Sequence, residues 1–190
     1  ALDRSLGSPE SGNRRRKTYG PGPVYLVEGP KATPAVRITL AEAGLKERSD
    51  LQEWVVEQPE AVGEGIRVVT IEYDRWSTGS GAAARQRLDV LGLDRAGRLV
   101  VDKLKREKDR EIHLQALTYA ALVSRFTPDI LATVHAEFLT RRRGRLTTPD
   151  EARALLRDHV EGELDPDLLA DPRIVLLAAE HPPQVVTAVD

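Results

Sequence analysis

The chain of 190 residues is long enough to form one substantial hydrophobic core, and nothing in its composition requires a second folded domain. It has 28 lysines and arginines against 30 aspartates and glutamates, so nucleic-acid binding would need a local basic patch. The absence of cysteine excludes disulfides, cysteine zinc sites and a thiol nucleophile. Without an apolar run near the roughly 20 residues that span a bilayer, and without an apolar secretory signal, we expect a cytoplasmic protein that does not enter the membrane.

Residues 1–23 are rich in serine, glycine, proline and arginine and have no periodicity that would bury a face. We expect a flexible basic leader here, followed by one folded domain over residues 24–190. A short strand is expected at residues 24–27. Whether this domain continues after residue 190 is left open.

The segment after the leader alternates between helical and extended patterns. Residues 47–57 carry apolar side chains at helical spacing, and Pro59 prevents the helix from continuing. The β-branched residues between 66 and 73 predict a strand, and residues 76–84, with glycine, serine and alanine, predict a loop.

Two short apolar runs, residues 87–91 and 100–106, flank a glycine-containing turn at 94–97 and predict a β-hairpin. Side chains alternate between the two faces of a strand. Lys103 and Lys105 therefore share one face of the second strand. A buried charge is tolerated only when it is paired or bound to a metal, so Asp89 beside Lys105 indicates an ion pair or a functional site.

The C-terminal half predicts helices followed by a strand. Residues 112–126 form a helical pattern, and Pro128 and Pro149 each stand at the first position of a further helix, the second running to about residue 160. A short helix is expected between residues 165 and 172, a strand at 173–178 and the start of another helix at 182–183. The apolar residues grouped on one side of the 112–126 helix are Leu114, Leu117, Ala121 and Leu122.

The quoted motifs resemble those of a known family. Arg-Leu-Asp-Val-Leu at 87–91, the turn, Leu-Lys-Arg at 104–106 and Gln115-x-x-x-Tyr119 resemble the PD-(D/E)XK nucleases, the restriction-endonuclease-like superfamily. The likeness is to a bacterial branch with Arg-(Ile/Leu)-Asp-(Val/Leu)-Leu followed by Glu-Leu-Lys-Arg, which includes mismatch-specific and defence-associated endonucleases. It covers residues 44–126, and more loosely the chain to 179. It implies an α+β, α/β/α-like core with a mixed central sheet flanked by helices.

The resemblance also implies a DNA-binding endonuclease of repair or phage defence that uses Mg²⁺ or Mn²⁺. Asp89 would be the first metal ligand, Lys105 the catalytic lysine and Glu47 the acidic residue of the first helix. Gln115 and Tyr119 would orient the site and hold DNA. Basic residues that would contact DNA phosphates are Arg106, Arg141, Arg142, Arg143 and Arg145, although such a cluster is more often a solvated loop.

One position departs from the pattern. The second carboxylate of the family stands two residues before the lysine, where this chain has Lys103. Asp102 is adjacent, and it would join Asp89 at a metal only if a β-bulge turned it to the same face. Three alternatives remain: an active enzyme with a displaced carboxylate, a nuclease-fold module that has lost catalysis and binds nucleic acid or protein, or a variant altered to disable cutting. Homodimerisation and further domains or subunits are left open.

The four histidines His113, His135, His159 and His181 have no spacing typical of metal ligands. We expect them to be structural or exposed.

Overall fold

The computed structural model describes residues 23–36, 38–39, 42–46, 50–76, 87–105 and 111–178. The chain divides into two compact units, Ala1–Arg37 and Ile38–Asp190. In the first unit, strands β1 (Tyr25–Glu28) and β2 (Lys31–Pro34) form an antiparallel hairpin. From the sequence, the first strand of this hairpin is expected to belong to the same domain as the rest of the chain.

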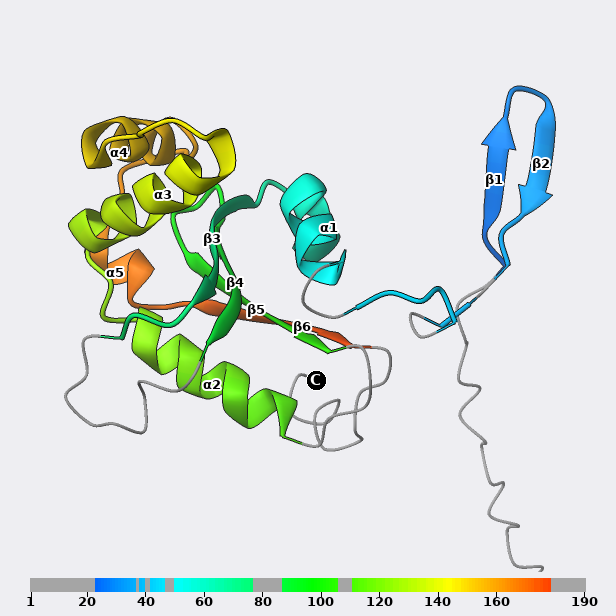
Figure 1. Cartoon of the computed structure of the whole chain (residues 1–190), viewed down its shortest axis with the longest axis horizontal. Helices are drawn as coiled ribbons and strands as arrows, with labels where there is room; N and C mark the ends of the chain where they lie inside the picture. The colour runs from blue at the N-terminus through cyan, green and yellow to red at the C-terminus, as the bar shows by residue number, and fades with distance from the viewer. Residues whose placement is uncertain are drawn as a thin grey trace, which may run out of the picture. The chain divides into compact units, whose positions relative to one another are not determined.

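The second unit is built on a four-stranded mixed sheet (Figure 1). Its strands are β3 (Arg67–Tyr73), β4 (Leu88–Leu93), β5 (Leu99–Lys105) and β6 (Arg173–Ala178), in that spatial order. β4 pairs antiparallel with both β3 and β5, and β6 runs parallel to β5. The predicted α+β class with a mixed sheet is therefore confirmed.

The helices begin where the sequence places capping residues and prolines. Thr127 Oγ1 accepts a hydrogen bond from the backbone N–H of Ile130, and Thr148 forms a capping box with Glu151. The helices that follow Thr127 and Thr148 both have proline in the first turn, where the backbone needs no N–H donor. The helical segments are α1 (Gln52–Glu57), η2 (Pro59–Val62), α2 (Ile112–Val123), α3 (Pro128–Arg143), α4 (Pro149–Arg157) and α5 (Pro166–Leu169).

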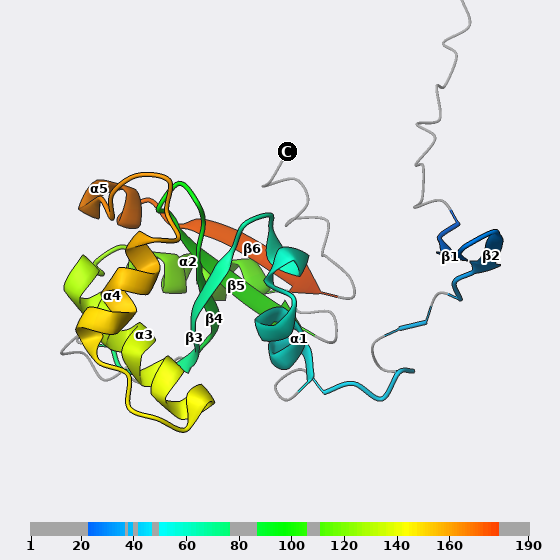
Figure 2. The ribbon, with the colours of Figure 1, turned by 90° about the horizontal axis from the view of Figure 1, so that it is seen from above.

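Two apolar clusters cover the two faces of the sheet. Leu91 and Val101 belong to a cluster that α2 supplies with Val123. On the opposite face, Val90, Val100 and Leu104 pack in a cluster with Val55 of α1 and Leu51, the residue before this helix. Figures 1 and 2 accordingly show α1 and α2 on opposite sides of the sheet.

The orientation of α2 differs from the apolar side suggested by the sequence. Leu114 and Leu117 are 53% and 55% exposed, whereas Ile112, Ala116 and Val123 are buried. The helix is apolar on more than one side, so residue spacing alone does not tell which side meets the sheet. The helix start expected at 182–183 lies outside the described residues.

The turn between β4 and β5 fixes their pairing. The backbone N–H of Arg98 donates to Oδ1 of Asp94 at 2.9 Å, and Gly97 has a φ of 89°, which favours glycine. Leu93 then pairs with Leu99. Three residues further from the turn, Val90 pairs with Asp102. This register decides which charges of the hairpin meet.

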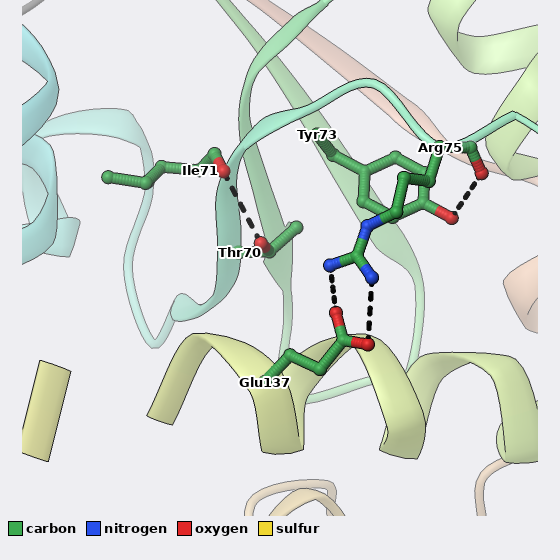
Figure 3. A network of polar contacts seen from close by, with 5 residues as sticks. All are labelled: Thr70, Ile71, Tyr73, Arg75 and Glu137. Atoms are coloured by element: carbon green, nitrogen blue, oxygen red, sulfur yellow. Dashed lines mark hydrogen bonds and ion pairs between the residues drawn. The ribbon is translucent and has the colours of Figure 1, made fainter. Parts of the chain in front are cut away.

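Polar contacts tie the segment after β3 to α3 (Figure 3). The two nitrogens of the Arg75 guanidinium face both carboxylate oxygens of Glu137, and the Tyr73 hydroxyl donates to the carbonyl of Arg75 at 2.7 Å. Both partners of this ion pair are well exposed, at 58% and 38%. No helix in the described ranges combines the length and apolar character needed to span a bilayer.

Candidate functional site

The charged centre of the hairpin lies on the face of the sheet that α2 covers. Asp89 stands near the start of β4, and Lys103 and Lys105 stand near the end of β5. Tyr119 of α2 is buried at the same place, and its ring stacks on Trp76 with 6.2 Å between ring centroids. The helix thus covers charges that strand alternation directs inward.

Asp89 pairs with Lys103. The Lys103 ammonium lies 2.8 Å from Oδ2 of Asp89, and the same oxygen accepts a hydrogen bond from the backbone N–H of Leu104 at 3.0 Å. The ammonium also lies 5.6 Å from the centroid of the Tyr119 ring, within the range of a cation–π contact. Both charges of the pair therefore have favourable partners despite their burial.

The negative charge of Asp89 is also felt at Tyr119. Burial raises the pKa of the Tyr119 phenol, and the nearby Asp89 carboxylate raises it further. The phenol consequently stays neutral at physiological pH.

Asp102 lies on the other face of the sheet. Its neighbours in the strand, Val101 and Lys103, face α2, while Asp102 is fully buried on the side of Val90, Val100 and Leu104. The only register shift in this part of the sheet lies in β3, between Val68 and Thr70, so no bulge turns Asp102 toward Asp89. The structure does not bring these two carboxyl groups together.

The environment of the Asp102 carboxyl favours its protonated form. Burial raises its pKa well above the ordinary value, only partly opposed by the charge of Arg173, and neither carboxyl oxygen has a hydrogen-bond partner among the described residues. A protonated acid in an apolar cluster is a poor ligand for a hard cation, which requires carboxylate oxygens.

The other predicted site residues fall into three groups. Gln115 and Tyr119 lie one turn apart on α2, Tyr119 is close to the pair, and Lys105 ends β5 on the same face. Glu47 and Arg106 lie outside the described residues. A separate exposed area at the end of α3 consists of Arg141, Arg142, Arg143 and Arg145. Within it, Arg142 pairs with Glu53 of α1.

The donor set near Asp89 fits a bound Mg²⁺ poorly. Within the described ranges, no three side chains of His, Cys, Asp or Glu are grouped so as to hold a metal ion. Asp89 is the carboxylate present at the centre, and a lysine ammonium already occupies its Oδ2. A divalent cation would have to displace Lys103 against charge repulsion.

Sequence reasoning identified Asp89 and Lys105 but expected these two to interact. It treated Lys103 as the replacement for a carboxylate, without giving it a partner. It also missed a second polar cluster, formed by Arg67, Arg95, His135 and His159 around a pocket. These four residues are scattered along the chain, so no motif signals them.

The geometry defines an α+β domain with a buried ion pair at the hairpin. Comparisons with protein-family models, curated proteins and solved structures gave no match to the chain.

Proposed function

We propose that the second unit is a restriction-endonuclease-like domain that binds nucleic acid at the partly exposed end of β5, where Lys105 follows the buried Asp89–Lys103 pair, and does not hydrolyse it by metal chemistry. The observation that carries this proposal is the 2.8 Å contact between Lys103 Nζ and Asp89 Oδ2. In this contact the Lys103 ammonium is bound to the carboxylate that would otherwise be the first metal ligand.

The charges on this face favour an anion over a divalent cation. One carboxylate, Asp89, stands with two ammonium groups, those of Lys103 and Lys105, on one face of the hairpin. Lys103 already neutralises Asp89, so this part of the hairpin presents ammonium groups to phosphate oxygens but no unpaired Asp89 carboxylate to Mg²⁺. Gln115 and Tyr119 add neutral hydrogen-bonding groups beside it.

The architecture agrees with the family resemblance. After α1, three antiparallel strands, the helices α2 to α5 and a strand parallel to β5 form a mixed sheet with helices on both faces. This is the arrangement that the hairpin motif and the Gln115-x-x-x-Tyr119 helix led us to expect. It supports family membership, while Lys103 argues against the chemistry of the family.

The competing function is an active Mg²⁺- or Mn²⁺-dependent endonuclease. For that, Lys103 would have to leave Asp89 and a second carboxylate would have to enter. Asp102 does not serve, because it lies on the opposite face, where burial raises its pKa and disfavours the carboxylate.

Fluorescence anisotropy with labelled DNA, in EDTA and in Mg²⁺ or Mn²⁺, tests the proposal alongside a plasmid cleavage assay. We expect binding that is unchanged by EDTA, falls steeply with salt and produces no cleavage. Lys105→Gln should weaken binding, whereas Arg157→Gln, which removes an exposed charge at the end of α4, should not.

Two results would contradict the proposal. Metal-dependent cleavage that Asp89→Asn abolishes would establish an active enzyme. Absence of binding at low salt would exclude nucleic acid as the ligand and leave a protein-binding module.

A further inference from the structure

A second polar site lies at the other end of the sheet. It is a pocket of about 390 Å³ beside the start of β3 and the β4–β5 turn, lined in part by Arg67, Arg95, His135 and His159. Arg67 pairs with Leu93, four residues along β4 from Asp89, which places it roughly 13 Å from the ion pair along the strand. The pocket shares none of the residues used in the proposed function.

Two arginines give the pocket a positive charge. Arg67 is half-buried, its Nε has no hydrogen-bond partner, and it makes no ion pair with another described residue. Burial lowers the pKa of Arg67, the charges of Arg95 and Arg143 lower it further, and Asp158 opposes them. The guanidinium remains charged even so, because arginine is not deprotonated in proteins.

Arg95 is held over the pocket by its surroundings. A Cβ atom added at Gly65, where φ is 65°, would lie 2.8 Å from Cγ of Arg95, so the absence of a side chain makes room for this stem. Nη1 of Arg95 donates to the carbonyl of His159 at 3.2 Å. The remaining guanidinium donors are available to a ligand.

His135 contributes a buried acceptor. The residue is 1% exposed, and Nδ1 lies 2.9 Å from the carbonyl oxygen of Val69. A carbonyl only accepts, so Nδ1 carries the proton of the neutral ring, and burial lowers the pKa of His135 to about 4. Nε2 then presents a lone pair, and it has no partner in the described part of the chain. A buried acceptor left unsatisfied costs free energy that a donor from a ligand would recover.

The other ionisable groups of the pocket do not cancel its charge. Burial is the main cause that lowers the pKa of His159, which favours its neutral ring, and its Nε2 donates to the carbonyl of Leu93 at 3.0 Å. Glu60 is an exposed carboxylate at the rim and forms no ion pair with Arg67 or Arg95 in the described structure. Outside the lining, the charges of Arg143 and Asp158 act on Arg67 in opposite directions, so two guanidinium groups against the one rim carboxylate leave the pocket positive.

We propose that this pocket binds a phosphate monoester. Its ionised oxygens would accept hydrogen bonds from Arg67 and Arg95, and its protonated oxygen would donate to Nε2 of His135. The organic part would lie against Phe138 and Leu139, which supply the apolar wall. A monoester has a second pKa near 6, so both the charge and the proton are present in mildly acidic to neutral solution. A sulfate has the charge but no proton to donate.

Calorimetric titration at a pH of about 6 with adenosine 5′-monophosphate, inorganic phosphate and sulfate tests the proposal, at ligand concentrations up to the order of 10 mM. We expect saturable binding of the monophosphate that is tighter than that of inorganic phosphate and at least about tenfold tighter than that of sulfate. Equal binding of sulfate would overturn the role of His135, and equal or tighter binding of inorganic phosphate would overturn the assignment to an ester. No saturation with any of the three would overturn the site.

Matched variants locate the binding. Arg95→Gln should weaken the monophosphate by about tenfold or more, because it removes a charged donor. Arg98→Gln, in the same turn but outside the pocket, is the control, since Arg98 faces Asp171. An equal loss of affinity for the monophosphate in both variants would show that it binds outside this pocket.

The imidazole ¹⁵N resonances of His135 provide a measurement on the unmodified chain. In the free protein, Nε2 should have the shift of an unprotonated nitrogen, and the monophosphate should move it while sulfate does not. An unchanged Nε2 resonance at saturating monophosphate would contradict the proposal, whatever the behaviour of the variants.

Discussion

The Lys103 ammonium lies 2.8 Å from Oδ2 of Asp89, and the two side chains are only 6% and 14% exposed. A lysine and an aspartate this well buried are stable as charges only because they pair, and because Leu104 and Tyr119 supply a further donor and an aromatic face. The pair therefore links β4 to β5 at the point where the family resemblance implies a metal.

The first prediction concerns the stability that depends on this pair. Lys103→Met leaves Asp89 buried without its cation, and we expect the free energy of unfolding to fall by about 3–5 kcal/mol. Urea denaturation followed by circular dichroism measures it. Combining Lys103→Met with Asp89→Leu should recover much of the loss, since no unpaired charge then remains.

The exposed Arg75–Glu137 ion pair provides the control (Figure 3). Glu137→Gln breaks a pair whose side chains are 58% and 38% exposed, and it should cost no more than about 1 kcal/mol. A Lys103→Met variant that lost no more stability than Glu137→Gln would show that the buried pair is not important for folding.

Strand alternation in the sequence placed Asp89, Lys103 and Lys105 on one face, but it did not show which lysine meets the aspartate. That depends on the cross-strand register, which the Asp94–Arg98 turn sets by pairing Leu93 with Leu99. The register brings position 89 opposite position 103. A turn one residue longer would have changed the pairing, and turn length is hard to fix from the sequence alone.

The elements of the fold were largely predictable because their signals are local. Thr127 and Thr148 with the prolines that follow them marked two helix starts, and the apolar runs of β3 to β6 marked the strands. The exposed side of α2, with Leu114 and Leu117, was not predictable, because it depends on contacts with distant residues. The pocket of Arg67 and His135 likewise joins segments 68 residues apart.

The second prediction is that Lys103→Glu creates a metal site. The change removes the cation bound to Asp89 and adds a carboxylate on the same face, so the local charge falls by two units. We expect affinity for Mn²⁺ to rise at least about tenfold, measured by calorimetry. Lys103→Gln removes the cation without adding a ligand and is the matched control. Identical titrations of the two variants would contradict a metal-binding role for this position.

The third prediction concerns the buried acid Asp102. Its folded pKa is raised by burial, so the folded state binds more protons than the unfolded state over the pH range between the two values. The associated stability is fully present below the unfolded pKa of about 3.9, and it is lost as pH rises from there through the folded pKa. Asp102→Val should remove this loss and raise the free energy of unfolding at pH 7 by about 1–3 kcal/mol, because two unsatisfied oxygens leave an apolar cluster. A less stable Asp102→Val protein would indicate that Asp102 has a partner.

The fourth prediction is that His135 makes the domain sensitive to acid. Burial lowers its folded pKa to about 4 from an ordinary value near 6.5, so the folded state binds fewer protons between these values. Stability should therefore be complete above about pH 6.5 and fall as pH drops toward 4, with a slope of at most about 1.4 kcal/mol per pH unit. His159, whose pKa is also lowered, acts in the same direction, and Asp102 acts in the opposite direction over an overlapping pH range.

The variant His135→Asn tests this contribution. It keeps a donor toward the Val69 carbonyl but does not titrate, so its unfolding free energy should fall less steeply with acid than that of the wild type. The comparison is best made in the Asp102→Val background, where the opposing proton uptake is absent, and equal slopes with and without His135 there would show that this ring does not titrate on unfolding.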